Sequence, residues 1–339
     1  MKTRKELKMK KIAVIGAGAW GTALAITAHN AGNQVIMWAF ENETVQEINN
    51  SQRTMYLPSA HLPETLKATS DMNNALTDVD FVLFATPAQF NRSVFEQMNK
   101  YLKDDTPVVL CAKGIELKTG LLLSEVIHEI NPKQKLAVLS GPGFAVELAR
   151  KCPTAVTIAS DDISLAKELC EVLKTDYFRP YSSSDMITPQ ICGALKNVMA
   201  IASGISDGCQ FGDNARAALI TRGLAEMARF SVMLGGQRDS VAGLSGVGDL
   251  MLTANSHQSR NYSCGFEIGQ AGWAKPVLEK STKTVEGVAT AASVLKRASD
   301  LKIEMPICQV VEEIIYHEKP IKEALLDLLN RPLKTEQEF

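Results

Sequence analysis

The sequence predicts an α/β protein in which a doubly wound, mainly parallel sheet is followed by an all-helical second domain. Three observations predict this class. In the first half of the chain, short apolar runs alternate with helix-like segments, which is the pattern of consecutive βαβ units. A glycine-rich turn joins the first apolar run to the first helix-like segment. Past residue 181, strand-like runs nearly vanish and long patterns rich in Ala, Leu and Met replace them.

The glycine-rich turn is the most informative of these features. Gly16, Gly18 and Gly21 form G-x-G-x-x-G between a short apolar strand and an Ala-rich helical stretch at residues 22–31. In such a turn the first glycine permits a tight bend, the second lets the backbone approach a pyrophosphate, and the third lets helix and strand pack closely. Free N–H groups at the start of the helix then hold the phosphates. This context predicts a Rossmann-type dinucleotide-binding domain rather than a glycine turn used only for packing.

Further strands of the sheet are expected after this turn, separated by helices. The apolar runs that predict them are residues 34–38, 81–85, 108–112, 136–139, 155–159 and 177–181. In the second half, helical patterns cover residues 188–205, 215–234, 240–253, 287–299 and 306–316. A Ser-rich stretch before Pro189 marks the change. We therefore expect a dinucleotide-binding domain at residues 10–184 and a helical substrate-binding, catalytic domain at residues 185–330.

Composition limits the classes of function. The chain has 339 residues, 45% of them hydrophobic and 22% charged, which is enough apolar material for two cores. Its net charge of −2 gives no support for a nucleic-acid-binding surface, and its apolar runs are too short to span a membrane. Seven scattered cysteines without a C-x-x-C pair suit reduced thiols, so we expect a cytoplasmic location. The five histidines lack metal-ligand spacing, so we expect no metal site.

Lys196 and Asp249 are the strongest candidates for chemistry. Lys196 lies in the otherwise apolar helical pattern GALKNVMA, so its side chain is expected to be buried. A buried lysine needs an acidic partner or a lowered pKa, and a lysine with a lowered pKa can exchange a proton near neutral pH. Asp249, in the glycine-rich run GLSGVGDL, is the expected partner. The sequence leaves open whether this pair is a catalytic site or a structural salt bridge.

Other segments have both a functional and an ordinary interpretation. Lys113 follows a strand, at the sheet edge where α/β proteins bind ligands, and Arg260 lies in the polar run SHQSRNYSCG. The loop SGPGFAVE, residues 140–147, could turn backbone N–H groups toward a ligand. The alternatives are solvated basic side chains and a plain turn. The Trp20 side chain would either line the cofactor site or pack in the core. Glu286 lies near the start of a helix, where compensation of the helix dipole alone would explain an acidic residue.

These segments together resemble the bacterial type of NAD(P)-dependent glycerol-3-phosphate dehydrogenase. The resemblance runs from Lys10 to about Leu329 and rests on motifs in a fixed order: GAGAWGTA, AKGIE, SGPGFAVE, GALKNVMAIASG, NARAALITRGLAEM, GLSGVGDL, QSRN and VEGV. It implies the reversible reduction of dihydroxyacetone phosphate to sn-glycerol 3-phosphate with NAD or NADP. It also implies a cytoplasmic homodimer that supplies glycerol 3-phosphate for phospholipid synthesis.

The resemblance also implies roles for particular residues. Lys196 matches the family's catalytic lysine, which exchanges the proton of the C2 hydroxyl, and Asp249 matches the acid that holds it. The residues that would bind substrate are Lys113, Gly141, Gly143, Lys196, Asn197, Asp249, Ser259, Arg260 and Asn261. The residues that would contact the cofactor are Gly16, Gly18, Ala19, Trp20, Gly21, Phe40, Lys113, Ala145, Arg260 and Glu286. A planar guanidinium such as that of Arg260 suits a substrate phosphate, because it can make two parallel hydrogen bonds.

Two positions depart from the family pattern, and one choice stays open. Gly143 stands where the family usually has Ser or Thr, and Tyr262 stands where a basic residue is common. An acid about twenty residues past the glycines would favour NAD. Phe40 stands near that position with Glu41 just beyond, and no Arg or Lys is at hand for a 2′-phosphate, although the family often prefers NADPH. The preference between NAD and NADP is left open.

Two other functions are compatible with parts of this pattern. Another two-domain dehydrogenase, of the 3-hydroxyacid or 6-phosphogluconate type, would explain the glycines and a helical lysine, but would not require Arg260 or the run GLSGVGDL. A redox-sensing module would bind a dinucleotide without turnover and would not need Lys196. A hydrogen bond between Lys196 and Asp249 would count against the sensor.

Overall fold

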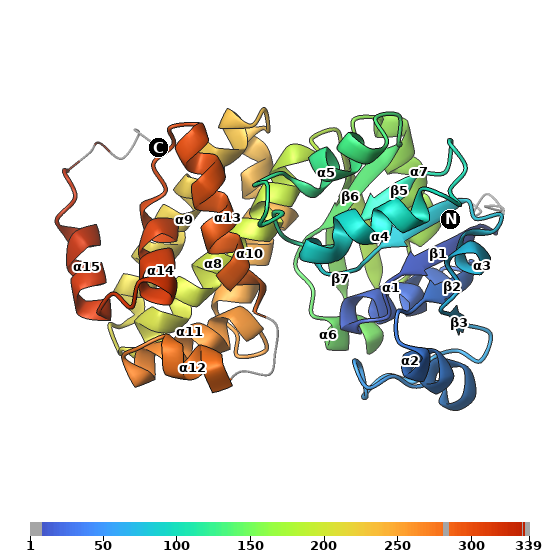
Figure 1. The fold of residues 1–339 in the computed structure, drawn as a ribbon, viewed down its shortest axis with the longest axis horizontal. Coiled ribbons are helices and arrows are strands. Elements are labelled where there is room, and N and C mark those ends of the chain that lie inside the picture. Colours follow the sequence, from blue (N-terminus) through green and yellow to red (C-terminus); the bar gives the residue numbers. More distant parts are fainter. Residues whose placement is uncertain (1–8, 281–284, 334, 336–339) are drawn as a thin grey trace. The chain divides into compact units, whose positions relative to one another are not determined.

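The computed structural model describes residues 9–280, 285–333 and 335, and the chain divides into two compact units (Figure 1). The sheet unit runs to Ala112 and resumes at Leu123–Met186, and the helical unit comprises Lys113–Leu122 and the chain from Ile187 onward. The excursion at residues 113–122 leaves the end of a strand and packs with the helical unit before the chain returns to the sheet. The domain limits expected from the sequence, 10–184 and 185–330, stay a prediction.

The sheet unit contains one eight-stranded sheet, which confirms the predicted fold class. In the order β3-β2-β1-β4-β5-β6-β7-β8, neighbouring strands are parallel except for the antiparallel pair β6 and β7. The strands are β1 (Lys11–Ile15), β2 (Gln34–Trp38), β3 (Lys67–Thr69), β4 (Phe81–Phe84), β5 (Val108–Leu110), β6 (Leu136–Ser140), β7 (Thr154–Ala159) and β8 (Phe178–Ser183). β3 was not expected, because three residues are too few to show a strand pattern. The strand order reverses at β1, which lies between β2 and β4.

Helices cover both faces of this sheet, so its central strands are apolar on both sides. Ile12 and Val14 of β1 belong to one core cluster, with α1 and α7, whereas Ala13 and Ile15 belong to another, with α3, α4 and α5. Figure 1 shows these helices against the strands. The helices of the unit are α1 (Ala19–Asn30), α2 (Asn42–Gln46), α3 (Met72–Leu76), α4 (Asn91–Met98), α5 (Leu123–Ile130), α6 (Ala145–Ala149) and α7 (Ile163–Leu173), with a π turn at Glu47–Ser51 and a 3-10 turn at Ala88–Phe90.

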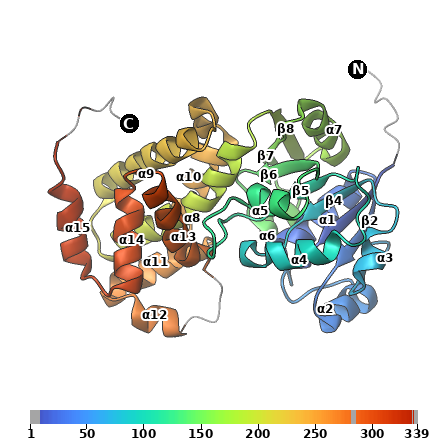
Figure 2. The ribbon, with the colours of Figure 1, turned by 45° about the horizontal axis from the view of Figure 1, so that its top comes forward.

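The helical unit is built around one long buried helix, α8 (Figure 2). Its α-helices are α8 (Ile187–Gly208), α9 (Asp213–Met233), α10 (Asp249–Ala254), α11 (Arg260–Ala271), α12 (Lys275–Lys280), α13 (Glu286–Asp300), α14 (Pro306–Tyr316) and α15 (Ile321–Leu329). α11 packs against α8 with their backbones in contact. A Cβ added at Gly204 would lie 2.1 Å from the carbonyl oxygen of Tyr262, and one added at Gly265 would lie 2.1 Å from that of Ile201. This contact fixes the first residues of α11 beside the middle of α8.

Two segments differ from the sequence prediction. The continuous helix expected at residues 240–253 is wrong, since a 3-10 turn (Arg238–Ala242) and a π turn (Leu244–Gly248) precede the short α10. Gly246 explains this path, because a Cβ there would lie 1.9 Å from the carbonyl oxygen of Val241. The polar run around Arg260 is the start of a helix, where the Ser259 hydroxyl accepts a hydrogen bond from the backbone N–H of Tyr262 at 3.2 Å.

One buried carboxylate in the helical unit lies outside the candidate site. Glu226 of α9 accepts hydrogen bonds from the backbone N–H groups of Ile307, at 2.6 Å, and Cys308, at 3.4 Å, at the start of α14. Burial raises the pKa of Glu226 to about 7. This side chain therefore joins α9 to α14 by satisfying helix-end donors.

Among the described residues, no helix combines the length and the apolar character needed to cross a bilayer.

Candidate active site

Asp249 lies at the centre of a cluster of charged side chains in the helical unit. It is the first residue of α10 and is fully buried. Its Oδ1 accepts a hydrogen bond from Nζ of Lys196 at 2.5 Å, and its Oδ2 accepts one from Nζ of Lys113 at 2.6 Å. The two lysines reach it from the middle of α8 and from the segment directly after β5. One carboxylate thus holds two ammonium groups, one on each oxygen.

Lys196 is the more enclosed of these two cations. Its side chain is 8% exposed, and burial lowers its pKa to about 8, against the opposing effect of the Asp249 carboxylate. The nearby charge of Lys113 lowers it further. Thr253, which the sequence analysis missed, accepts a second hydrogen bond from Nζ at 2.8 Å and donates its own proton to the carbonyl oxygen of Asp249. Its position four residues after Asp249, one helical turn away, was the available signal.

A chain of amide hydrogen bonds runs beside this cluster. Nδ2 of Asn261 donates to Oδ1 of Asn197 at 2.9 Å, and Nδ2 of Asn197 donates to Oε2 of Glu286 at 3.3 Å. Oδ1 of Asn261 accepts from the backbone N–H of Gly287 at 2.8 Å. These contacts tie α8, α11 and the start of α13 together. They place Asn197, Asn261 and Glu286 in one polar network next to Lys196.

Arg260 adds an exposed cation to this region. It is the first residue of α11 and directly follows the buried cap Ser259. Burial raises the pKa of Glu286, and the positive charges of Arg260, Lys196 and Lys113 oppose that rise. Hydrogen bonds therefore join Lys196 to Asp249, and Asn197 to Asn261 and Glu286, whereas Ser259 and Arg260 directly precede Asn261 in the chain. The structure adds Lys113 as a second partner of Asp249.

The sheet unit carries the predicted glycine turn at the carboxyl end of β1. Gly16 has φ +113°, and a Cβ there would lie 2.9 Å from the backbone of Ala85. A Cβ at Gly21 would lie 2.0 Å from the carbonyl oxygen of Gly16, whereas one at Gly18 would lie in open space among the described residues. Gly18 precedes the first residue of α1, so the free N–H groups of that helix face this opening. The geometry fits the phosphates of a dinucleotide, at the point where the strand order reverses.

The other sheet-unit residues assigned from the sequence lie near strand ends. Gly141 follows β6 with φ +152°, where a Cβ would lie 2.9 Å from Cα of Val156, so this position requires glycine. A Cβ at Gly143 would lie 3.2 Å from the Trp20 indole, which limits the room for a larger residue. Ala145 begins α6, Ala19 begins α1, and Phe40 follows β2 with 79% of its surface exposed.

Two remaining predictions concern Tyr262 and metals. The Tyr262 hydroxyl donates a hydrogen bond to Asp207 at 2.5 Å, and Arg216 donates to the same carboxylate oxygen at 2.7 Å. Tyr262 therefore contributes to packing of α11 on α8, in place of the basic residue common in the resembled family. Among the described residues, no group of three or more His, Cys, Asp or Glu side chains is arranged to hold a metal ion.

Comparisons with known proteins cover almost the whole chain. The family model for the N-terminus of NAD-dependent glycerol-3-phosphate dehydrogenase matches residues 11–166, and the model for its C-terminus matches residues 185–326. A glycerol-3-phosphate dehydrogenase (NAD(P)+) of Parvibaculum lavamentivorans is 46% identical over 97% of this chain and 99% of its own length. One of Rhodospirillum rubrum is 46% identical over 96% of this chain and 93% of its own length.

Solved structures agree with these sequence matches. The crystal structure of glycerol-3-phosphate dehydrogenase from Coxiella burnetii has a TM-score of 0.90 and 38% identity, and the match covers 95% of this chain and 99% of that chain. The yeast glycerol-3-phosphate dehydrogenase structure has a TM-score of 0.83 and 28% identity, over 96% of this chain and 100% of that chain. Both units of the fold are therefore shared with enzymes of one named activity.

Proposed function

Because the chain belongs to the NAD-dependent glycerol-3-phosphate dehydrogenase family, we propose that its buried lysine–aspartate cluster performs the proton transfer of that reaction. The chain is an NAD(P)-dependent oxidoreductase that acts on a CH–OH group, interconverting dihydroxyacetone phosphate and sn-glycerol 3-phosphate. The observation that carries the proposal is the hydrogen bond of Lys196 to Asp249 in a buried setting. The same contact counts against a dinucleotide sensor without turnover.

Lys196 is the proposed proton donor and acceptor at the C2 oxygen of the substrate. The bound nicotinamide supplies or accepts the hydride at C2. In reduction, the ammonium of Lys196 gives a proton to the oxygen on which negative charge develops, and in oxidation the neutral amine takes it back. A pKa lowered to about 8 makes both states accessible near neutral pH. Asp249 fixes the position of Lys196 and also binds the second cation, Lys113. Lys113 is proposed to stabilise the negative charge that develops on the C2 oxygen of the substrate.

Arg260 is the proposed ligand of the substrate phosphate. Its exposed guanidinium, at the first residue of α11, can make two parallel hydrogen bonds to phosphate oxygens. Ser259 and Asn261 flank it, and Asn197 is held next to Lys196 by Asn261, so we assign these three to substrate positioning. Because α8 and α11 contact through Gly204 and Gly265, the phosphate ligand and the proton donor keep a fixed separation.

The glycine turn is the proposed holder of the cofactor pyrophosphate. Gly16, Gly18 and Gly21 shape it, and the N–H groups from Ala19 and Trp20 onward are available to the phosphates. The remaining assignments follow the family resemblance and are proposals for the same reason. They give substrate contacts to Gly141 and Gly143, and cofactor contacts to Phe40, Lys113, Ala145, Arg260 and Glu286.

The direct test mixes the purified full chain with dihydroxyacetone phosphate and follows the oxidation of NADH and of NADPH in parallel. We expect oxidation with this substrate and little with unphosphorylated dihydroxyacetone, because Arg260 would then have no anion to bind. Nucleotide binding without oxidation would favour another substrate or a sensor. We further propose a cytoplasmic role in supplying glycerol 3-phosphate for phospholipid synthesis.

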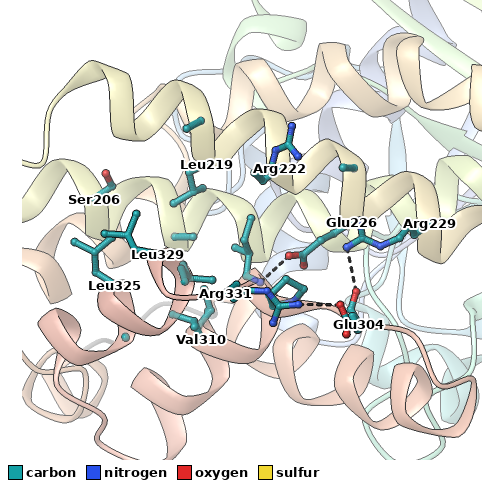
Figure 3. Close-up of a pocket in the computed structure, with 18 of the residues that line it drawn as sticks. Ser206, Leu219, Arg222, Glu226, Arg229, Glu304, Val310, Leu325, Leu329 and Arg331 are labelled. Atoms are coloured by element: carbon teal, nitrogen blue, oxygen red, sulfur yellow. Dashed lines mark hydrogen bonds and ion pairs between the residues drawn. The ribbon is translucent and has the colours of Figure 1, made fainter. Parts of the chain in front are cut away.

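We also propose that the protein is a homodimer that uses an apolar groove of the helical unit (Figure 3). The groove has a volume of about 1000 Å³, and residues of α9, α14 and α15 line most of it. Val232, Met233 and Leu329 line it and are more than a third exposed, as is typical of a surface that another protein covers. Light scattering should give the mass of a dimer, and Leu329→Glu should shift it to the mass of a monomer. A wild-type monomer at micromolar concentration would refute the proposal.

A further inference from the structure

The end of β2 lies directly beside the glycine turn, where it can determine which nicotinamide cofactor fits. Ile15 of β1 pairs with Trp38 of β2, and the backbone N–H of Gly16 donates to the carbonyl oxygen of Trp38 at 3.0 Å. The residues that follow Trp38 therefore leave the sheet next to the proposed pyrophosphate site. In dinucleotide-binding domains, an acid here, about twenty residues past the glycines, meets the ribose 2′-hydroxyl of NAD.

Glu41, one residue past Phe40, is the acid nearest this position. It follows Gly21 by twenty residues and is exposed, with an extended backbone (φ −85°, ψ 126°) directly before α2. Burial, followed by the negative charges of Glu41 and Glu47, raises the pKa of the nearby Tyr56 phenol. That phenol is therefore neutral near pH 7 and adds no charge to the surroundings of Glu41.

The loop that carries Glu41 is anchored at several points. Glu47 accepts a hydrogen bond from the backbone N–H of Met55 at 3.0 Å, which folds residues 54–57 back toward the turn that follows α2. Leu57 is fully buried in the core of the sheet unit. Glu41 therefore lies on a fixed loop rather than on a freely moving one, and its charge is presented at a defined place.

The charges of this loop favour a neutral hydroxyl over a phosphate. Residues 39–56 contain the acids Glu41, Glu43 and Glu47 and the single base Arg53, which gives a net charge of −2 (three acids minus one base is two). Lys67, the base of β3, pairs with Ile36 in the middle of β2, two residues before the end of that strand. A 2′-phosphate carries nearly two negative charges at neutral pH and would meet the Glu41 carboxylate, with Arg53 as the single base of the loop.

We propose that Glu41 makes this protein selective for NADH over NADPH, by accepting a hydrogen bond from the ribose 2′-hydroxyl and repelling a 2′-phosphate. This inference rests on the proposed dehydrogenase function and answers the cofactor choice that the family name leaves open. A like charge a few ångströms from the 2′-phosphate opposes its binding. We therefore expect NADH to bind about tenfold more tightly than NADPH, a difference that corresponds to ~1.4 kcal/mol.

The test measures the dissociation constants of NADH and NADPH for the full chain by calorimetry, without substrate, in wild type and four variants. Glu41→Gln should remove most of the difference between the two nucleotides by strengthening NADPH binding. Glu41→Arg should invert the preference. Glu43→Gln, which removes a neighbouring exposed acid of the same loop, is the matched control and should keep the wild-type ratio. Arg53→Gln should leave NADPH binding unchanged.

Each outcome separates this proposal from the function on which it rests. Equal or tighter binding of NADPH by the wild type would overturn the selectivity and leave the dehydrogenase proposal standing. Equal effects of Glu41→Gln and Glu43→Gln would overturn the specific role of Glu41 in favour of a general charge effect. Loss of NADPH binding in Arg53→Gln would assign the 2′-phosphate to that arginine and also overturn it. Failure of the folded wild type to bind either nucleotide would refute the cofactor site itself.

Discussion

The glycine turn of the sheet unit and the lysine–aspartate cluster of the helical unit are built over different distances along the chain. The three glycines of the turn lie within six consecutive residues, 16–21. In the cluster, Asp249 is 53 residues from Lys196 and 136 residues from Lys113. The turn is a local backbone shape, whereas the cluster exists only when several helices have packed. Substitutions should therefore affect them in different ways.

The largest effect is expected at the proton-transferring group. Lys196→Ala should lower turnover by about 10²–10⁴-fold, because the C2 oxygen of the substrate loses its proton donor. NADH binding should be unchanged, since the glycine turn is untouched. Steady-state kinetics and calorimetry check the two halves of this prediction. Lys167→Ala, at an exposed lysine of α7 in the sheet unit, is the control and should keep full activity. Comparable turnover in the two variants would refute the role of Lys196.

Asp249→Asn tests whether the cluster depends on its central charge. The change leaves two lysines without their carboxylate, and breaking a buried ion pair in this way costs about 3–5 kcal/mol of stability. Because Asp249 raises the pKa of Lys196, its loss should lower that pKa further. The loss of reductase activity with rising pH should then begin at a lower pH than in the wild type. An unshifted pH–rate profile, in a variant that remains folded, would contradict this account.

Arg260→Ala should act on substrate affinity more than on turnover. Loss of a charge-assisted contact to phosphate costs about 1.5–3 kcal/mol, which is a rise in KM of about 10- to 150-fold. Activity with unphosphorylated dihydroxyacetone, however low, should not change, and this serves as the control. An unchanged KM for dihydroxyacetone phosphate would show that the phosphate binds elsewhere.

A pair of glycine substitutions separates backbone shape from ligand approach within the turn. Gly16→Ala should destabilise the protein by about 1–3 kcal/mol, because its φ of +113° and its contact with Ala85 exclude a side chain. Gly18→Ala should leave stability nearly unchanged, since its Cβ would enter open space, but should weaken NADH binding. Urea unfolding and calorimetry distinguish the two variants. Equal stability losses would contradict the separate roles.

Glu226 is a buried carboxyl group of the helical unit that takes no part in the proposed chemistry. Because burial raises its pKa from 4.5 to about 7, the folded protein favours the protonated carboxyl, and the free energy of unfolding should fall as pH rises between these values. Glu226→Gln should flatten that dependence and leave turnover unchanged. Urea midpoints at about pH 5 and about pH 8 measure it. An unaltered pH dependence in the variant would show that Glu226 is not the group responsible.

The contrast between the two regions also explains what the sequence could predict. The glycine turn and most strands were identified because their signals are contiguous, and the Lys196–Asp249 pair was identified from the cost of burying an ammonium group. The role of Lys113 as a second partner of Asp249 could not be predicted, because it depends on the excursion at residues 113–122. Thr253 was missed because threonine is ordinary in a helix. The helix that begins at Arg260 was missed because its apolar face alternates with glycine and polar residues.

The excursion at residues 113–122 has a consequence for recombining this fold with its relatives. A gene fusion that joins the sheet unit of one homologue to the helical unit of another at residues 186 and 187 would transfer Lys113 with the wrong half. The hybrid would then contain an Asp249 from one parent and its second ammonium group from the other. Active chimeras should therefore require three crossovers, which return residues 113–122 to the parent that supplies the helices.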